Sequence, residues 1–225
     1  MKTIGMIVAV EMDAVLAKYG RAAGVEKRGG FEIHRYENGD FTLCIVSAGA
    51  GELAAAAATE LLIASYGAEL IVNFGVVGGL TEKMALARTV VVESVVHYDF
   101  DTSAWDGCEP GRYAAFPTPR IPTTPQLVKR ALALCPELRP VVCASADKFV
   151  GSAQAKAELH ERFGAEICEM EAAGVVLTCS RAGVPCLVVK TVSDGITGGA
   201  EEFTKELARS AEICLEITDQ IIREL

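Results

Sequence analysis

The stretch "VPCLVVKTVSDG", residues 184–195, holds a strand-length run of apolar and β-branched residues that ends in Ser193, Asp194 and Gly195. The run has little polar alternation, which is typical of a strand covered on both faces of its sheet. In open α/β sheets, ligands lie beyond the carboxyl ends of the strands. The stretch therefore predicts a buried strand and a polar site where that strand ends.

Similar apolar runs recur along the chain and alternate with helical patterns, which predicts an α/β fold. We expect a three-layer sandwich with a central mixed, mostly parallel sheet flanked by helices. No linker divides the chain, so residues 1–225 are expected to form one domain. The other expected strands are 3–10, 41–48, 69–75, 89–96 and 140–145, and the expected helices are 51–67, 125–134, 152–164, 171–183 and about 201–223.

The bulk composition excludes several classes of partner. The chain has 225 residues, is 51% hydrophobic and carries a net charge of −9. Phosphate contacts need clustered Lys and Arg, and the chain has no basic run, so no nucleic-acid partner is expected. No apolar run is long enough to cross a membrane without an interrupting Gly or charge. A small-molecule substrate is the better expectation.

The eight cysteines lie mostly inside apolar runs such as "LCIVS" and "VVCAS", where free Cys behaves as a small hydrophobic residue. There is no CxxC pair, and the N-terminus does not read as a signal peptide. We therefore expect a reduced, cytoplasmic protein. The three histidines are far from one another in sequence, so no metal and no cofactor are expected.

One segment, residues 99–125, fits neither strand nor helix and is rich in Pro, Gly and Asp. An excursion of this length in a compact domain is usually functional, as a lid or a partner-contacting loop. A plain surface insertion is an equally good explanation from loop statistics alone.

Two further places combine a strand end with Gly or charge. Glu11 and Asp13 follow the first strand and open a helix, where the helix dipole alone would favour acidic residues. The stretch "NFGVVGGL", residues 73–80, resembles a phosphate-cradling turn only loosely. Its glycines are also explained by a tight turn and close packing.

The stretch "ICEMEAAG", residues 167–174, places Glu169 and Glu171 on either side of Met170 at a strand-to-helix switch. Such carboxylates can accept hydrogen bonds from the hydroxyls of a sugar, above an apolar floor of Met. Glu171 also suits the positive end of a helix. Asp194 can act as a proton donor at its strand end, although Ser-Asp-Gly is also a favoured turn sequence.

These motifs occur in one order: "IGMIVAVEMDAV", "VSAGAGELAAAAATELL", "ELIVNFGVVGGL", "HYDFDTSAW", "ADKFVGS", "ICEMEAAGVV" and "VPCLVVKTVSDG". In that order they resemble the purine nucleoside phosphorylase and nucleosidase superfamily, and within it bacterial 5′-methylthioadenosine/S-adenosylhomocysteine nucleosidases. The resemblance implies a nucleoside phosphorylase-like fold. It also implies hydrolysis of the N-glycosidic bond of 5′-thio-substituted adenine nucleosides, and a homodimer.

The resemblance also implies roles on the base side of the site. Asp194 corresponds to the acid that protonates the leaving adenine, and Ser193 to the serine that orients it. Phe149 matches the aromatic that stacks on the base, and the main chain at Val150 would bind the base edge. Trp105, in the long segment, corresponds to the aromatic lent to the partner's 5′-substituent pocket.

On the sugar side, Glu171 matches the glutamate that binds the ribose hydroxyls, and Met170 the methionine beneath the sugar. Glu169 belongs to the same motif in a supporting role. Phe203 is a looser match to the 5′-substituent pocket. Asp13 stands where family members usually carry the glutamate that holds the attacking water.

The nucleophile side departs from the family. Besides the shorter Asp13, the Gly-rich turn with Val76 and Gly78 has no hydroxyl, and Lys190 replaces an arginine. Three alternatives therefore stay open: a phosphate-dependent phosphorylase, a hydrolase of futalosine or another nucleoside, and a nucleoside-binding protein without turnover.

Overall fold

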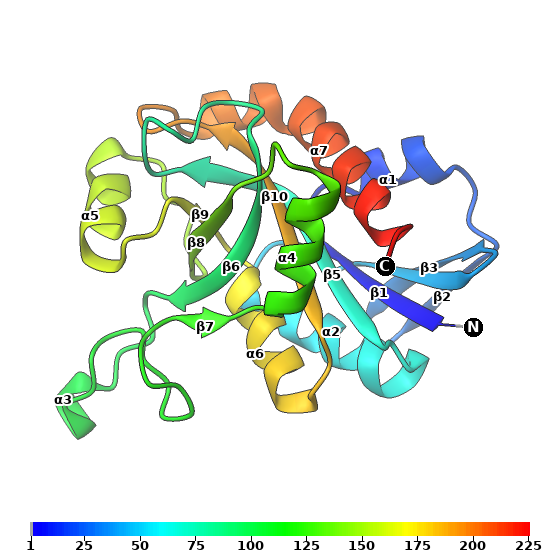
Figure 1. Cartoon of the computed structure of the whole chain (residues 1–225), viewed down its shortest axis with the longest axis horizontal. Coiled ribbons are helices and arrows are strands. Elements are labelled where there is room, and N and C mark those ends of the chain that lie inside the picture. The colour runs from blue at the N-terminus through cyan, green and yellow to red at the C-terminus, as the bar shows by residue number, and fades with distance from the viewer. Residues whose placement is uncertain (1) are drawn as a thin grey trace.

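The computed structural model describes residues 2–225 and confirms the alternation of strands and helices (Figure 1). The strands are β1 (Lys2–Val8), β2 (Gly24–Arg28), β3 (Phe31–Asn38), β4 (Phe41–Ser47), β5 (Leu70–Gly79), β6 (Thr89–His97), β7 (Ile121–Pro122), β8 (Pro140–Ser145), β9 (Ile167–Glu169) and β10 (Cys186–Asp194). The helices are α1 (Met12–Tyr19), α2 (Glu52–Tyr66), α3 (Ser103–Asp106), α4 (Pro125–Leu134), α5 (Ala153–Phe163), α6 (Ala172–Ala182) and α7 (Ala200–Ile222).

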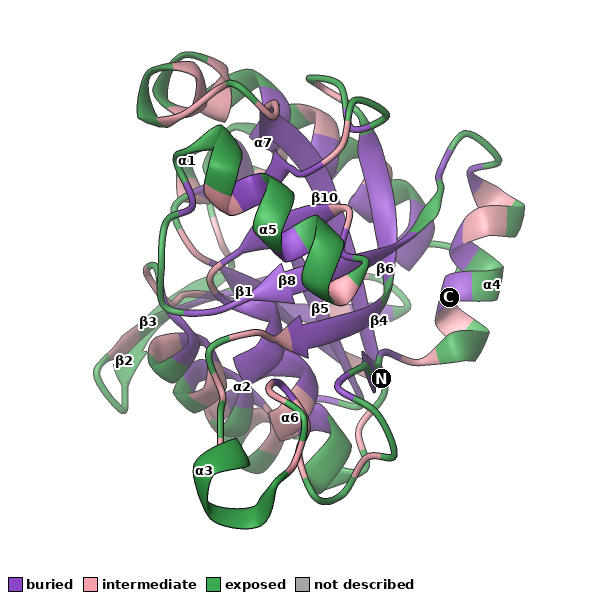
Figure 2. Cartoon of the chain, turned by 90° about the vertical axis from the view of Figure 1, so that its left-hand side faces the viewer, coloured by how far each residue is buried: buried purple, intermediate pink, exposed green. Residues whose placement is uncertain are grey.

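The long strands are covered on both faces, as their unbroken apolar runs predict. Along β10, Leu187 and Val189 join one hydrophobic core, whereas Val188 and Val192 join the other. Helices α1, α4 and α7 close the core of Leu187 and Val189, and helices α2 and α6 close the core of Val188 and Val192. Figure 2 shows the resulting buried centre of strands beneath partly exposed helices.

The predicted three-layer sandwich needs correction, because part of the sheet closes on itself. Strand β10 pairs with β5 on one side and with β6 on the other, and β6, β8, β9 and β5 complete a ring. Strands β1, β4, β3 and β2 extend from β5 outside this ring. The sheet is also not mostly parallel: among the described residues, five strand pairings are parallel and five antiparallel.

Two smaller predictions are also corrected. Residues 73–79 are not a turn but part of β5, every residue of which is buried. Segment 99–125 is largely irregular, as expected, but it contains α3 and β7. The hairpin β2–β3 was not predicted, since all of β2 is exposed and its sequence lacks an apolar face.

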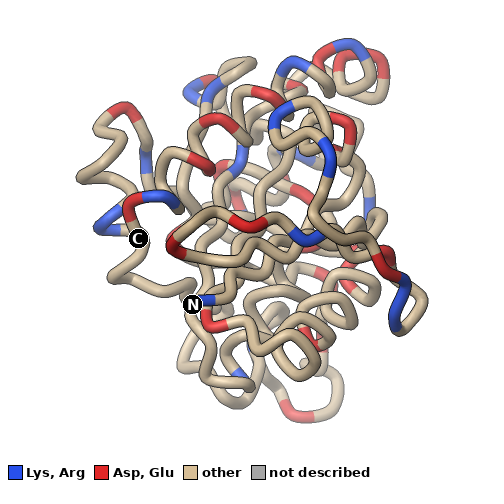
Figure 3. Tube along the Cα trace, turned by 90° about the vertical axis from the view of Figure 1, so that its right-hand side faces the viewer, with Lys and Arg blue, Asp and Glu red and all other residues tan. Residues whose placement is uncertain are grey.

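The described residues contain no helix long and apolar enough to cross a bilayer. Acidic and basic residues are interspersed along the trace in Figure 3, so this side of the molecule has no extended basic surface. All eight cysteines are free, and seven of them are buried.

The contact between α2 and α6 depends on Gly174. A Cβ at this position would lie 2.4 Å from the backbone oxygen of Glu52 and 3.3 Å from the backbone nitrogen of Ala56. Backbone atoms cannot rotate away as a side chain can, so the two helices would have to separate. Glycine is therefore needed here for close approach.

We predict that Gly174→Ala lowers the free energy of unfolding by about 1–3 kcal/mol, the usual cost of overpacking. Thermal and denaturant unfolding would measure this, with the exposed Ser180→Ala in the same helix as control. A Gly174→Ala variant as stable as the parent, as helix propensity alone would favour, would contradict the argument.

Candidate active site

A cleft opens where β5 changes its neighbour. One edge of β5 pairs with β1 from Leu70 to Asn73 and with β9 only at Gly78 and Gly79. Between these two pairings, no strand in the described part of the chain lies beside this edge of β5. The fold thereby leaves main-chain groups of β5 free for side chains at the carboxyl ends of β1 and β9, the place where ligands bind in such sheets.

The cleft has a volume of about 260 Å³, close to the lower end of the range of small-molecule sites. It brings together residues from the ends of β1, β5, β9 and β10, from the loop before α5 and from α7. The lining residues are Ala9, Val10, Glu11, Ala50, Val76, Val77, Gly78, Lys148, Phe149, Val150, Cys168, Glu169, Met170, Glu171, Asp194 and Phe203.

Asp13, predicted to face the nucleophile, lies outside this cleft. It is exposed on the first turn of α1, and Glu11 takes the inward position instead. Glu11 Oε1 accepts a hydrogen bond from the Val76 N–H at 2.9 Å, and its Oε2 accepts one from the Val10 N–H at 2.9 Å. Glu11 and Asp13 are two residues apart at the start of α1, so their side chains point in different directions and only one of them can reach β5.

Gly75 explains how Glu11 can lie so close to β5. A Cβ at Gly75 would come within 2.7 Å of Glu11 Oε1. The glycine thus allows the carboxylate to lie directly against the strand and to accept the Val76 N–H. The close-packing explanation of this Gly-rich stretch, rather than a phosphate-binding turn, agrees with this contact.

The two glutamates around Met170 have different surroundings. Glu169 accepts hydrogen bonds from the backbone N–H groups of Glu171 and Ala172 at the start of α6, and pairs with Lys190 Nζ at 3.0 Å. Burial would raise the pKa of Glu169, but the charge of Lys190 and these hydrogen bonds lower it below the ordinary value. Glu169 is therefore held as a carboxylate.

Glu171 has no such cation in contact and faces the cleft. Its Oε1 accepts the Gly51 N–H at 2.9 Å. Burial first, and then the neighbouring charge of Glu169, raises the pKa of Glu171 to about 8. A carboxyl group with one satisfied oxygen in a cleft has capacity left for the hydroxyls of a ligand.

Of the residues predicted on the nucleophile side, Val76 and Gly78 reach the cleft and Lys190 does not. Lys190 is instead fully buried. Burial alone would lower the pKa of Lys190, but Glu169 and Glu171 raise it. Lys190 thus acts on the site through Glu169 and not by facing a ligand.

Asp194 is buried and lines the cleft from the end of β10, as predicted. Its Oδ1 accepts a hydrogen bond from Ser193 Oγ at 3.2 Å. Its Oδ2 accepts one from the ammonium of Lys156, a residue of α5 that is 0% exposed. Ser193 is itself fully buried and does not line the cleft, and its Oγ also lies 3.3 Å from the carbonyl oxygen of Val77.

Aromatic side chains form one wall of the cleft. Phe149 and Phe203 pack edge to face, with ring centroids 5.5 Å apart. Phe149 stays 43% exposed, so one ring face is free to stack on a flat ligand. Val150 lines the cleft beside it, and the structure brings all three residues together.

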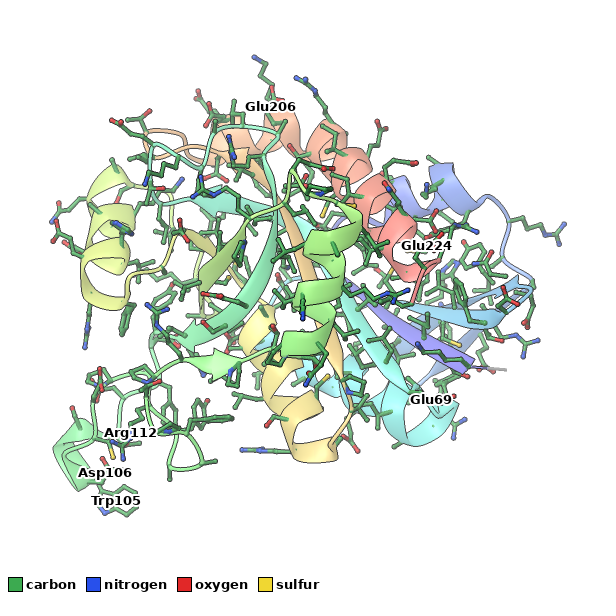
Figure 4. All side chains as sticks on the ribbon, in the orientation of Figure 1. Glu69, Trp105, Asp106, Arg112, Glu206 and Glu224 are labelled. Atoms are coloured by element: carbon green, nitrogen blue, oxygen red, sulfur yellow. The ribbon has the colours of Figure 1, made fainter. Side chains whose placement is uncertain are left out.

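Trp105 is not part of this cleft. It lies at the tip of α3, which projects from the body of the molecule, and it is 86% exposed (Figure 4). None of the described residues, 2–225, covers its ring.

Glu11 and Lys156 are the functional candidates that the sequence did not assign. The signal for Glu11 was present, because it follows the first strand, but the family pattern favoured Asp13. Lys156 lies in a polar, amphipathic helix, where a lysine normally faces solvent. Among residues 2–225, no group of three His, Cys, Asp or Glu side chains is arranged to hold a metal ion.

Known proteins share this architecture. A 5′-methylthioadenosine/S-adenosylhomocysteine nucleosidase of Treponema pallidum is 28% identical over 97% of this chain and 93% of that protein. The nucleosidase of Helicobacter pylori in complex with butyl-thio-DADMe-Immucillin-A has a TM-score of 0.94 at 27% identity, covering 100% of this chain and 99% of that chain. The native futalosine hydrolase of the same organism also has a TM-score of 0.94, at 26% identity, covering 100% of this chain and 98% of that chain.

The family model described as "Phosphorylase superfamily" matches residues 3–223, nearly the whole of the chain. With the fold, the cleft and these relatives in agreement, the protein belongs to the phosphorylase superfamily.

Proposed function

We propose that this protein hydrolyses the N-glycosidic bond of 5′-thio-substituted adenine nucleosides such as 5′-methylthioadenosine and S-adenosylhomocysteine, releasing adenine. The observation that supports this most is the meeting of three carboxyl groups, Glu11, Glu171 and Asp194, in one cleft beside an exposed aromatic face. The similar nucleosidases support the same substrate class.

The base lies against Phe149, with its edge on the main chain at Val150. As the bond from sugar to base breaks, its electron pair moves to the base, and Asp194 donates a proton there. Proton donation of this kind typically contributes about 10²–10⁴-fold to the rate. Ser193, bonded to Oδ1, orients the acid.

The sugar lies over Met170, with its hydroxyls on Glu171. A cationic, oxocarbenium-like sugar is favoured electrostatically by nearby carboxylates. Glu11 takes the proton of the attacking water, the role that the family pattern assigned to Asp13. The side chain of Glu11 has the full length of a glutamate, so the shorter side chain of Asp13 does not shorten the reach of the base.

Phosphorolysis is less well supported than hydrolysis. Lys148 is the one Lys or Arg among the lining residues, because Lys156 and Lys190 are buried and paired with carboxylates. A phosphate dianion in the cleft would thus lie near several acidic side chains, which would repel it. Futalosine hydrolysis remains the second candidate, since both enzyme types of Helicobacter pylori match this fold equally well.

The substrate assignment predicts adenine release from 5′-methylthioadenosine and S-adenosylhomocysteine at equal rates with and without phosphate. Inosine, adenosine and futalosine serve as comparison substrates, with base release followed by chromatography. Faster release from futalosine would establish the second candidate. Release that requires phosphate would make the protein a phosphorylase.

The acid assignment predicts that Asp194→Asn lowers kcat by about 10²–10⁴-fold while substrate binding is largely kept, since Asn cannot donate a proton as an acid. Single-turnover rates and equilibrium binding would separate the two effects. Asp40→Asn, on an exposed turn, is the control. Near-parental turnover by Asp194→Asn would remove Asp194 as the acid.

The placement of Glu11 predicts a contrast between two variants. Glu11→Gln should lower kcat by about 10²-fold or more, because an amide cannot take a proton from water. Asp13→Asn should leave kcat unchanged, because Asp13 is exposed outside the cleft. The reverse ranking would restore Asp13 as the general base.

A homodimer is the expected assembly, supported by the uncovered Trp105 at the tip of α3. In this arrangement Trp105 covers the 5′-substituent pocket of the partner, with Phe203 on the same pocket. Sedimentation should give twice the chain mass. Trp105→Ala should raise KM for S-adenosylhomocysteine, whose 5′-substituent is large, more than for adenosine. A monomer with parental KM values in Trp105→Ala would contradict this assembly.

A further inference from the structure

Lys156 is an unusual residue of α5. Most of this helix is exposed, and its two buried residues are Lys156 and Leu159. Beneath it lies a small apolar cluster that includes Val142, Val150 and Cys168. A lysine is rarely buried without partners, because removal of its charge from water is costly. The position therefore calls for a specific set of acceptors.

Lys156 finds those acceptors at the end of β10. Its Nζ donates to Asp194 Oδ2, to the Gly195 carbonyl at 2.6 Å and to the Gly198 carbonyl at 3.4 Å. An ammonium group has three N–H donors, and each has an acceptor here. The contacts join the acid to the loop that leads into α7.

The space for this ion pair is provided by Gly78 of β5. A Cβ at Gly78 would lie 3.1 Å from Asp194 Oδ2, 3.4 Å from Lys156 Nζ and 3.0 Å from Cys168 Sγ. The strand, the acid and the lysine are thus packed tightly enough to define one position for the carboxyl group. Lys156 and Asp194 therefore form a buried ion pair with a defined geometry, unlike an exposed ion pair on the surface.

We propose that Lys156 is a positioning residue for the acid: it fixes the side chain of Asp194 at the cleft and balances the negative charge left there when the proton is transferred. The inference rests on the proposed function. It gives α5 a role in the site through Lys156, although Lys156 does not itself line the cleft.

The O–H bond of the Asp194 carboxyl group breaks and an N–H bond forms on the base, while the electron pair of the sugar–base bond moves to the base. The resulting carboxylate stays beside the ammonium of Lys156. Water adds to the sugar and gives its proton to Glu11, and exchange with solvent restores both carboxyl groups.

Other charges near Asp194 bear on its protonation. Cys168 faces it from β9, and Glu202 of α7 accepts the neighbouring Gly195 N–H at 2.7 Å. Glu11, Glu169 and Glu171 lie in the same cleft. All of these except the thiol favour a retained proton on Asp194, whereas Lys156, the one cation among residues 2–225 that contacts Asp194, favours release of the proton.

The test compares kcat across pH for Lys156→Met, Lys156→Gln and Lys156→Arg. Loss of the charge should lower kcat by about 10- to 100-fold. It should also move the descending alkaline limb of the kcat profile to higher pH, because the carboxyl group without its cation holds its proton more tightly. Lys156→Arg should keep the limb near its parental position.

Lys205→Gln, an exposed lysine on α7, makes the same change in net charge and is the control. Should Lys156→Met fail to fold, Lys156→Gln carries the same test, because it removes the charge and keeps N–H donors. A parental limb in the uncharged variants, with kcat lost only in proportion to the folded fraction, would overturn the proposal. Absence of base release by the parent would instead overturn the proposed function.

Discussion

Four carboxyl groups meet beneath and around one cleft, and two buried ammonium groups make that arrangement stable. Glu169 is paired with Lys190, and Asp194 with Lys156, each lysine coming from a different element. Without these pairs, like charges at the ends of β1, β9 and β10 would repel one another in a poorly hydrated interior. Glu11 and Glu171, which have no lysine in contact, are satisfied by backbone N–H groups instead.

This division separates the groups that support the site from those left for a ligand. The carboxylate of Glu169 is already bonded to Lys190 and to the backbone at the start of α6, so it holds in place the helix that begins directly after Glu171. Glu171 keeps free capacity and a raised pKa because burial and the charge of Glu169 act on it together. The motif around Met170 thus combines one structural and one available carboxyl group.

The sequence predicted six of the strands (β1, β4, β5, β6, β8 and β10), five helices and most of the cleft, because their patterns are local. Apolar runs mark β5 and β10, and a polar residue at the end of a strand marks Asp194. The closure of the sheet was not predictable in this way, since the double pairing of β10 depends on residues distant in sequence. Lys156 was missed for the same reason: its partners lie 38 and more residues away. Whether Glu11 or Asp13 faces the cleft depends on how the first turn of α1 is oriented, and the spacing of the two residues does not give that orientation.

The double pairing of β10 has a consequence for motion. From Val189 to Thr191 the strand is bonded on both sides, so its amide hydrogens exchange with solvent only when a large part of the sheet opens. The regular strand ends at Asp194, and the loop to α7 begins at the next residue. Asp194, the proposed proton donor, therefore lies at the boundary between a strand that is paired on both sides and the irregular loop that leads into α7. Local opening of that loop need not break the strand pairing that holds the backbone of Asp194 in place.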